Sequence, residues 1–243
     1  MITRIRKIGK RVVSATPILQ DWHLFHLTYP YVSFLKYLWK EIQVKFGAKL
    51  KDQFFPYDKN STVSGNILAG KNVKVTQRGG CYVQGWGGVF IGDYTTIAQN
   101  CIITSANHSL TNHAEEVKKE VIIGDHCWIA SNSLIMGGVI LGPRTVVAGG
   151  SVVTKSFPEG YCLIGGNPAK FIKAIPKEEF VPRKFEREMY GYVPSNKFTE
   201  YKRKYLSKIK FHYDLSKVTS NQDLIEGSIA DDGKQMKFAP NGV

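Results

Sequence analysis

The stretches IGDYTTIAQNCII (91–103) and VIIGDHCWIASNSLIMGGVILGPRTVVAGGSVV (121–153) repeat with a period of six residues. One aliphatic residue recurs at the same position of each unit: Ile91, Ile97, Ile103, Ile123, Ile129, Ile135, Leu141, Val147 and Val153. Four positions further on, the residue is usually small or β-branched: Thr95, Cys101, Cys127, Ser133, Val139, Thr145 and Ser151. A helix gives a period of 3.6 and a strand a period of two, whereas a short repeat of this kind is typical of a parallel β-solenoid. We therefore expect three units to close one triangular coil, with the aliphatic side chains of successive coils stacked inside it.

The repeat is interrupted once, between Ile103 and Ile123. These residues lie 20 positions apart, which is one unit of six plus 14 extra residues. The interruption follows the segment SANHSL (105–110), which contains His108. Because loops that leave a rigid scaffold commonly carry binding and catalytic groups, the sequence predicts a loop excursion at 109–122 with a functional site beside it.

The repeat also sets the boundaries of the predicted domains. Projected backwards from Ile91, the period meets Ile67 and Val73 but also two glycines, so the coil is expected to start near residues 61–67 with an irregular second turn. The chain then divides into three regions: a basic, amphipathic helical region at 1–60, a β-helix of about five coils at 61–173, and a partly helical extension at 174–243. Within the extension, residues 197–209 predict a basic helix.

Positive charge is concentrated near the N-terminus. The net charge of the chain is +13, and residues 1–51 hold ten Lys and Arg against Asp21 and Glu41, a net +8. In the same region, apolar residues spaced through 31–46 predict an amphipathic helix of about 16 residues that ends near Gly47. Such a helix can cover one end or flank of the coil, or it can contact an anionic membrane surface. No nucleic-acid-binding motif accompanies the charge, so no nucleic-acid partner is expected.

Cysteine usage and hydropathy bear on the compartment. The four cysteines show no CxxC spacing, and Cys101 and Cys127 fall at the small, inward position of the repeat, so buried thiols in a reducing compartment are expected. The sequence shows no signal-peptide h-region and no apolar run of about 18 residues. We therefore expect a cytoplasmic protein, whose basic N-terminal helix allows a peripheral contact with the inner face of the membrane.

Three short motifs resemble those of a known family. The segment IIGDHCWIA (122–130) resembles the IGDxxWIG signature of hexapeptide-repeat acetyltransferases, and VVTK (152–155) followed by GGNPAK (165–170) resembles the VTK…GNPAK ending of that family. Residues 87–173 are most similar to galactoside, maltose and nodulation-factor acetyltransferases and to O-acetyltransferases of bacterial surface polysaccharides. The resemblance implies a left-handed β-helix, a homotrimer with the active site between subunits, acetyl-CoA as cosubstrate, and as acceptor a sugar hydroxyl of a surface polysaccharide or its precursor.

The resemblance also implies roles for individual residues. His108 matches the catalytic base, and an imidazole, with an ordinary pKa of about 6.5, suits removal of a proton from an attacking hydroxyl. Positions that contact CoA in the family correspond here to Ser131, Gly149, Thr154, Lys155, Lys170 and Lys173. Trp128 is a candidate for lining the acceptor cleft, as are Arg78, Gln84 and Trp86 in the irregular coils below His108. No Cys matches a catalytic position, so direct attack in a ternary complex is expected.

Two other functions remain open at this point. His108 and His113 form an H-x4-H pair of the kind that γ-carbonic anhydrases use for zinc on the same fold, but Phe90 stands one coil back, and residues 60–100 contain no His. Zinc catalysis needs three protein ligands and an open position, and His126, the other nearby candidate, lies within the IGDxxW motif. No metal is therefore expected. A non-enzymatic structural solenoid is the other alternative, and it leaves the CoA-type ending unexplained.

Overall fold

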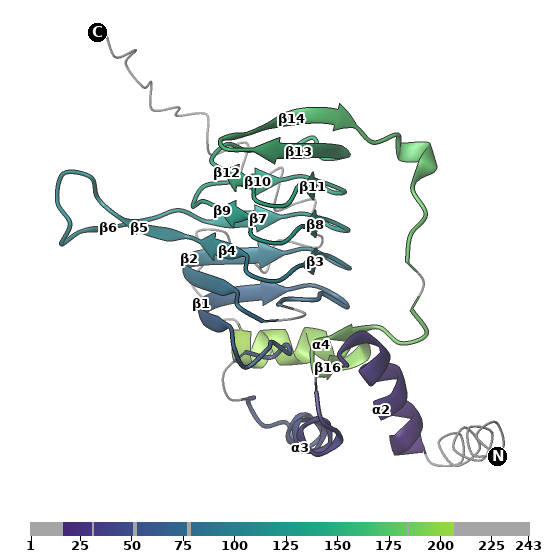
Figure 1. Ribbon diagram of the computed structural model, residues 1–243. Helices are drawn as coiled ribbons and strands as arrows, with labels where there is room; N and C mark the ends of the chain where they lie inside the picture. Colours follow the sequence, from purple (N-terminus) through teal and green to yellow (C-terminus); the bar gives the residue numbers. More distant parts are fainter. Residues whose placement is uncertain (1–16, 31, 51–52, 77–78, 184, 207–243) are drawn as a thin grey trace, which may run out of the picture.

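A computed structural model describes residues 17–30, 32–50, 53–76, 79–183 and 185–206. The described chain is a solenoid of stacked, parallel β-coils, with helices at one end and a hairpin projecting from its side (Figure 1). This architecture confirms the expected fold class, a left-handed parallel β-helix with flanking helices. The predicted substrate residue Arg78 lies outside the described residues, as does the end of the extension from residue 207.

The coil has three faces, and β1 and β2 each continue from the first face to the second. Face 1 contains β1 (Thr62–Ala69), β2 (Tyr82–Ile91), β4 (Ile102–Thr104), β9 (Leu134–Ile135) and β12 (Val152–Val153). Face 2 contains the second parts of β1 and β2 with β7 (Val121–Ile123) and β10 (Ile140–Leu141). Face 3 contains β3 (Thr96–Ile97), β8 (Trp128–Ile129), β11 (Val146–Val147) and β13 (Cys162–Gly166).

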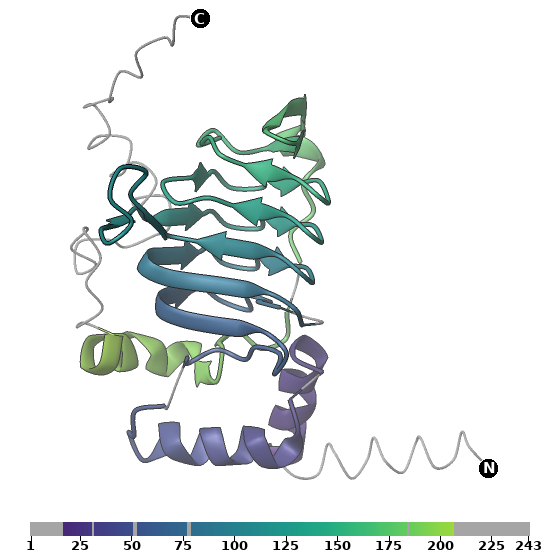
Figure 2. The ribbon, with the colours of Figure 1, turned by 60° about the vertical axis from the view of Figure 1, so that its left-hand side comes forward.

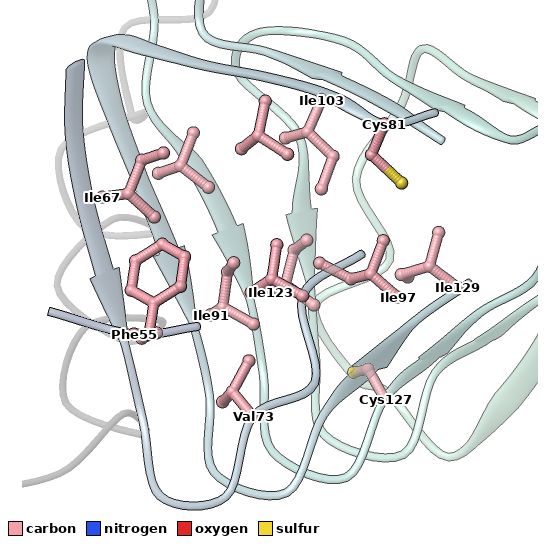
Figure 3. Close-up of a cluster of buried hydrophobic side chains, with 14 of the residues drawn as sticks. Phe55, Ile67, Val73, Cys81, Ile91, Ile97, Ile103, Ile123, Cys127 and Ile129 are labelled. Atoms are coloured by element: carbon pink, nitrogen blue, oxygen red, sulfur yellow. The ribbon is translucent and has the colours of Figure 1, made fainter. Parts of the chain in front are cut away.

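The hexapeptide repeat accounts for the core. All nine aliphatic repeat positions are at most 2% exposed, and so are the seven small or β-branched positions. Figure 3 shows Ile91, Ile97, Ile103, Ile123 and Ile129 pointing into the same interior. The strand register stacks like on like, since Ile97 pairs with Ile129 and Ile129 with Val147. Burial of apolar area, the main favourable term in folding, is thus supplied at the same position of each coil.

The corners between faces have their own six-residue period. After seven of the nine inward aliphatic residues, the third residue has a positive φ, between 55° and 88°: Tyr94, Asn100, His126, Asn132, Gly138, Arg144 and Gly150. Asn and Gly tolerate this left-handed conformation best. His126 therefore occupies a corner position at which the backbone repeatedly takes this conformation.

The first strand of the solenoid, β1, begins at Thr62. The second turn is irregular: β2 runs for ten residues through the corner between faces 1 and 2, and its register against β1 shifts between Gly65 and Ile67. Gly65 and Gly85 allow this, because a Cβ on Gly65 (φ +83°) would lie 2.5 Å from the carbonyl carbon of Gly85.

Helices cover the first coil (Figures 1 and 2). They are α2 (Pro17–Thr28), α3 (Phe34–Lys45) and α4 (Ser195–Tyr201), the last followed by the π-helical turn η2 (Lys202–Leu206). The predicted amphipathic helix is α3, which is 12 residues long and starts after Ser33, whose Oγ accepts a hydrogen bond from Lys36 N. Helix α2 was not expected. None of the described helices is long and apolar enough to cross a membrane.

Two segments leave the coil. The excursion is a hairpin of β5 (Ala106–His108) and β6 (Glu116–Lys118), so it starts three residues before the predicted 109 and ends before β7. The extension begins with β14 (Ala169–Ala174), antiparallel to β13, and the turn η1 (Lys177–Glu179). It then returns along the corner between faces 2 and 3 to the hairpin of β15 (Met189–Tyr190) and β16 (Val193–Pro194) at the helical end (Figure 1).

Aromatic and charged contacts hold the returning extension against this corner. Phe180 packs under the Arg144 guanidinium, with 3.8 Å between the guanidinium carbon and the ring centroid. Further along, Lys71 Nζ lies 3.4 Å from a carboxylate oxygen of Glu188. The expected appendage at 174–243 is therefore, over its described part, packed along the whole solenoid.

Candidate active site beside the hairpin

His108 is held by the hairpin that leaves the corner between faces 1 and 2. It is exposed, it ends β5, and it is paired in register with Glu116 of β6. Its Nδ1 lies 2.8 Å from the backbone oxygen of His113 in the hairpin loop. A carbonyl oxygen only accepts hydrogen bonds, so Nδ1 carries a proton and donates it, and in the neutral imidazole Nε2 keeps its lone pair. The hairpin therefore presents His108 in the tautomer that a general base needs.

A pocket of about 300 Å³ lies between this hairpin and face 1. It brings together three of the residues singled out in the sequence, His108, Gln84 and Trp86. Six further residues line it that the sequence did not single out: Tyr82, Ile102, Thr104, Ala106, Asn107 and Glu116. Tyr82, Ile102 and Thr104 sit on the outer side of face-1 strands, so only knowledge of which strands stack could have identified them.

Gln84 fixes the start of the hairpin. It is 6% exposed, and its Oε1 accepts a hydrogen bond from Ala106 N at 3.0 Å. The Thr104 hydroxyl lies 3.0 Å from the same Oε1 and 2.8 Å from Ala106 O. Ala106 precedes His108 by two residues, so this side chain sets where the strand that carries His108 leaves the coil.

The predicted CoA-contacting residues fall into separate groups within one chain. Ser131 and Gly149 stack at the corner between faces 3 and 1, where a Cβ on Gly149 would lie 3.2 Å from Ser131 O. Lys170 lies at the same corner. It pairs with Gly165, and a Cβ added to Gly165 would contact Ala148, the residue before Gly149.

The remaining members lie elsewhere. Thr154 and Lys155 are exposed and follow β12 at the corner between faces 1 and 2, the corner that carries the hairpin. Lys173 is exposed and pairs with Leu163 on face 3. The two candidate phosphate-binding lysines therefore lie on opposite sides of face 1, Lys170 at the corner with face 3 and Lys155 at the corner with face 2. Within one chain they do not converge on a single ligand.

Trp128 lies apart from the His108 pocket. It is 54% exposed on face 3 and lines a second pocket, of about 380 Å³, together with Arg144, Phe180 and Arg183. The sequence placed Trp128 in one cleft with Gln84 and Trp86, and within a single chain the structure does not bring them together.

His126 lines the same second pocket and stacks on Tyr94, with 4.8 Å between ring centroids. Burial lowers the pKa of the His126 imidazole; Asp125 opposes this shift, and Arg144 and Arg183 add to it. Within the described ranges, no three His, Cys, Asp or Glu side chains are grouped so that they could hold a metal ion.

Comparison with known proteins identifies the repeat. Residues 120–155 match the family model described as "Bacterial transferase hexapeptide (six repeats)". The galactoside O-acetyltransferase of Escherichia coli K12 is 29% identical over 126 residues, which make up 50% of this chain and 58% of that protein. A second E. coli K12 protein, "Putative lipopolysaccharide biosynthesis O-acetyl transferase WbbJ", is 34% identical over 103 residues, 37% of this chain and 52% of that protein. The chain thus spans about half the length of these curated relatives.

Among solved structures, a maltose O-acetyltransferase from Clostridium difficile 630 is 26% identical, with a TM-score of 0.42 over 57% of this chain and 84% of that one. The expected resemblance to hexapeptide-repeat acetyltransferases is confirmed by the sequence matches. The solenoid segment 120–155 is thus similar to the hexapeptide repeat of bacterial transferases.

Proposed function

We propose that this protein is an acetyl-CoA-dependent O-acetyltransferase that acts on a sugar hydroxyl of a bacterial surface polysaccharide or its precursor. The observation that carries the proposal is the fixed tautomer of His108, whose Nε2 is free beside a pocket on the solenoid face. Two further facts support it: the IGDxxW and VTK…GNPAK motifs, and the similarity to relatives that are named O-acetyltransferases. Free, buried cysteines fit a reaction in the cytoplasm.

In the proposed reaction, the acceptor hydroxyl attacks the thioester carbonyl of acetyl-CoA directly. His108 Nε2 takes the hydroxyl proton as the new C–O bond forms. The carbonyl becomes an oxyanion, for which a backbone N–H in the segment 128–131 is the proposed donor. The oxyanion collapses, the C–S bond breaks, and the His108 imidazolium returns the proton to the CoA sulfur. Since no step needs an acetyl-enzyme, the free thiols have no part in it.

Acetyl-CoA is proposed to lie against the motif residues at the ends of face 1. Backbone and small side chains at Ser131 and Gly149 allow close approach of the pantetheine arm. Exposed lysines attract the phosphates as point charges; these are Lys155, Lys170 and Lys173. Thr154 adds a hydroxyl beside Lys155.

A homotrimer would complete such a site. Ser131 and Gly149 lie at one end of face 1 and the His108 hairpin leaves from the other, so a single chain keeps the proposed oxyanion donor and the base apart. In a trimer, the corner of one subunit that carries Ser131 and Gly149 can lie against the His108 hairpin of the neighbouring subunit. Tyr82 and Ile102, each 40% exposed on face 1, offer apolar area for this contact. Light scattering is expected to give a trimer, and a monomer at micromolar concentration would contradict the shared site.

The function is tested by measuring CoA release from acetyl-CoA in the presence of nucleotide sugars and oligosaccharides. We expect at least one sugar acceptor to accelerate release well above the hydrolysis rate, with mass spectrometry showing one added acetyl group on that acceptor. Acetylation of amines only, or no binding of acetyl-CoA by calorimetry, would refute the proposal.

A further inference from the structure

Helix α3 is apolar on two opposite sides. One side, with Tyr37 and Val44, is buried against the rest of the protein. The other carries Leu35, Trp39 and Ile42 and is continued by Phe46, the residue that caps the C-terminal end of the helix; they are 75%, 61%, 38% and 84% exposed. Their spacing of four, three and four residues places them in one line along the helix. We call these four residues the α3 stripe.

Lysines border the α3 stripe. At about 100° per residue, Lys36 and Lys45 fall on either side of it, and both are exposed. Beyond Lys45, a cleft between α3 and α4 is lined by two more exposed lysines, Lys197 and Lys204, and by one exposed acid, Glu200, so that its charge is net positive. Long lysine stems can lie along an apolar surface while their ammonium groups reach the polar layer beside it.

We propose that the α3 stripe docks on an anionic membrane surface. An amphipathic helix that lies in the interface, with its apolar side among the acyl chains and lysines at the headgroups, has this distribution of side chains. The helix is 12 residues long, which is too short to span a bilayer, where about 20 residues are needed. The contact is therefore peripheral.

Charge favours a membrane over a second copy of the chain as the occupant. Two copies that met through the α3 stripe would bring their own lysine borders together, which is repulsive, whereas anionic headgroups neutralise them. The net +8 of residues 1–51 adds to the attraction. The helices cover one end of the solenoid, whereas the hairpin with His108 projects from its side (Figures 1 and 2), so docking leaves the pocket open.

The test is flotation of the full-length protein with vesicles of phosphatidylcholine alone or mixed with phosphatidylglycerol. We expect the protein to bind the mixed vesicles, since each lysine near an anionic surface raises the affinity about fivefold. This binding should weaken as salt is raised, because salt screens the attraction between the lysines and the headgroups. Trp39→Glu and Phe46→Glu should each lower this binding by tenfold or more, because a carboxylate replaces the inserted ring. Val181→Glu is the matched control, since Val181 is 82% exposed on the extension, away from the helices, and this variant should bind like the wild type.

Two outcomes would overturn the proposal. One is equal binding of wild type and Trp39→Glu to the mixed vesicles, with both proteins folded by circular dichroism. The other is a lipid-free oligomer that Trp39→Glu dissociates while vesicle binding is absent, which would make a second copy the occupant. The readout needs no acyl transfer, so it stands or falls independently of the proposed enzymatic activity.

Discussion

Replacing Gln84 by Leu tests how the solenoid positions His108. Leucine is close to glutamine in size but has no acceptor, so the buried Ala106 N–H loses its 3.0 Å partner. The Thr104 hydroxyl keeps Ala106 O at 2.8 Å as an acceptor, so the principal loss is one buried hydrogen bond, with a cost of about 1–3 kcal/mol. That cost falls on the first residue of the strand that ends in His108. A displacement of His108 by about 1 Å is expected to lower turnover on the order of 100-fold.

Two measurements check this prediction. Hydrogen exchange at the Ala106 amide should become faster by about 5- to 150-fold, the factor that corresponds to the lost free energy. Turnover of acetyl-CoA with the acceptor found in the screen should fall, while the Kd for CoA stays within about twofold. Gln53→Leu is the control variant, because it removes a glutamine side chain that donates to Gly65 O of β1, whereas Gln84 Oε1 accepts its hydrogen bond from the hairpin. Unchanged exchange and unchanged turnover in Gln84→Leu would refute the positioning role.

Three further predictions concern the core, a corner and the lysines. Ile129→Ala, at a position that is 0% exposed, should lower the free energy of unfolding by about 2–5 kcal/mol in urea titrations, and a loss below 1 kcal/mol would mean that the stacked interior is not close-packed. Asn132→Val should cost about 1–2 kcal/mol at its φ of 62° whereas Asn132→Gly should cost less, and equal costs would contradict the conformational explanation of the corner period. Lys155→Glu should weaken CoA binding roughly 3- to 30-fold in low-salt calorimetry and less as salt is added, and unchanged affinity at low salt would remove Lys155 from the cofactor site.

The fold could be predicted from the sequence because one period determines it. Every coil reuses the same inward position, so Ile91 to Val153 identify the interior without knowledge of long-range contacts. The corner period was present in the sequence as Asn100, Asn132 and Gly150, but Tyr94, His126 and Arg144 at the same position hid it. Helix α2 was missed because its 12 residues depend on aromatic packing, such as Phe25 against Tyr37 at 4.7 Å.

The candidate site could be predicted only in part. His108, Gln84 and Trp86 line one pocket. The break in the repeat after Ile103 places the excursion next to the coil that contains Gln84 and Trp86. Glu116 was missed because its place depends on the hairpin register, which pairs it with His108 across a loop. Trp128 was grouped with the others from motif position, but its strand stacks on face 3, and strand stacking cannot be read from a local motif.

The central claim, that His108 is the general base of acetyl transfer, is tested most directly by comparing His108→Ala with the wild type. The measurement is the rate of CoA release with the acceptor found in the screen, alongside the Kd for CoA from calorimetry. The account predicts a turnover that is roughly 10²–10⁴-fold lower with CoA affinity nearly unchanged, because the side chain is exposed and acts on the acceptor proton. Near-normal turnover of His108→Ala on an acceptor that the wild type acetylates would contradict it.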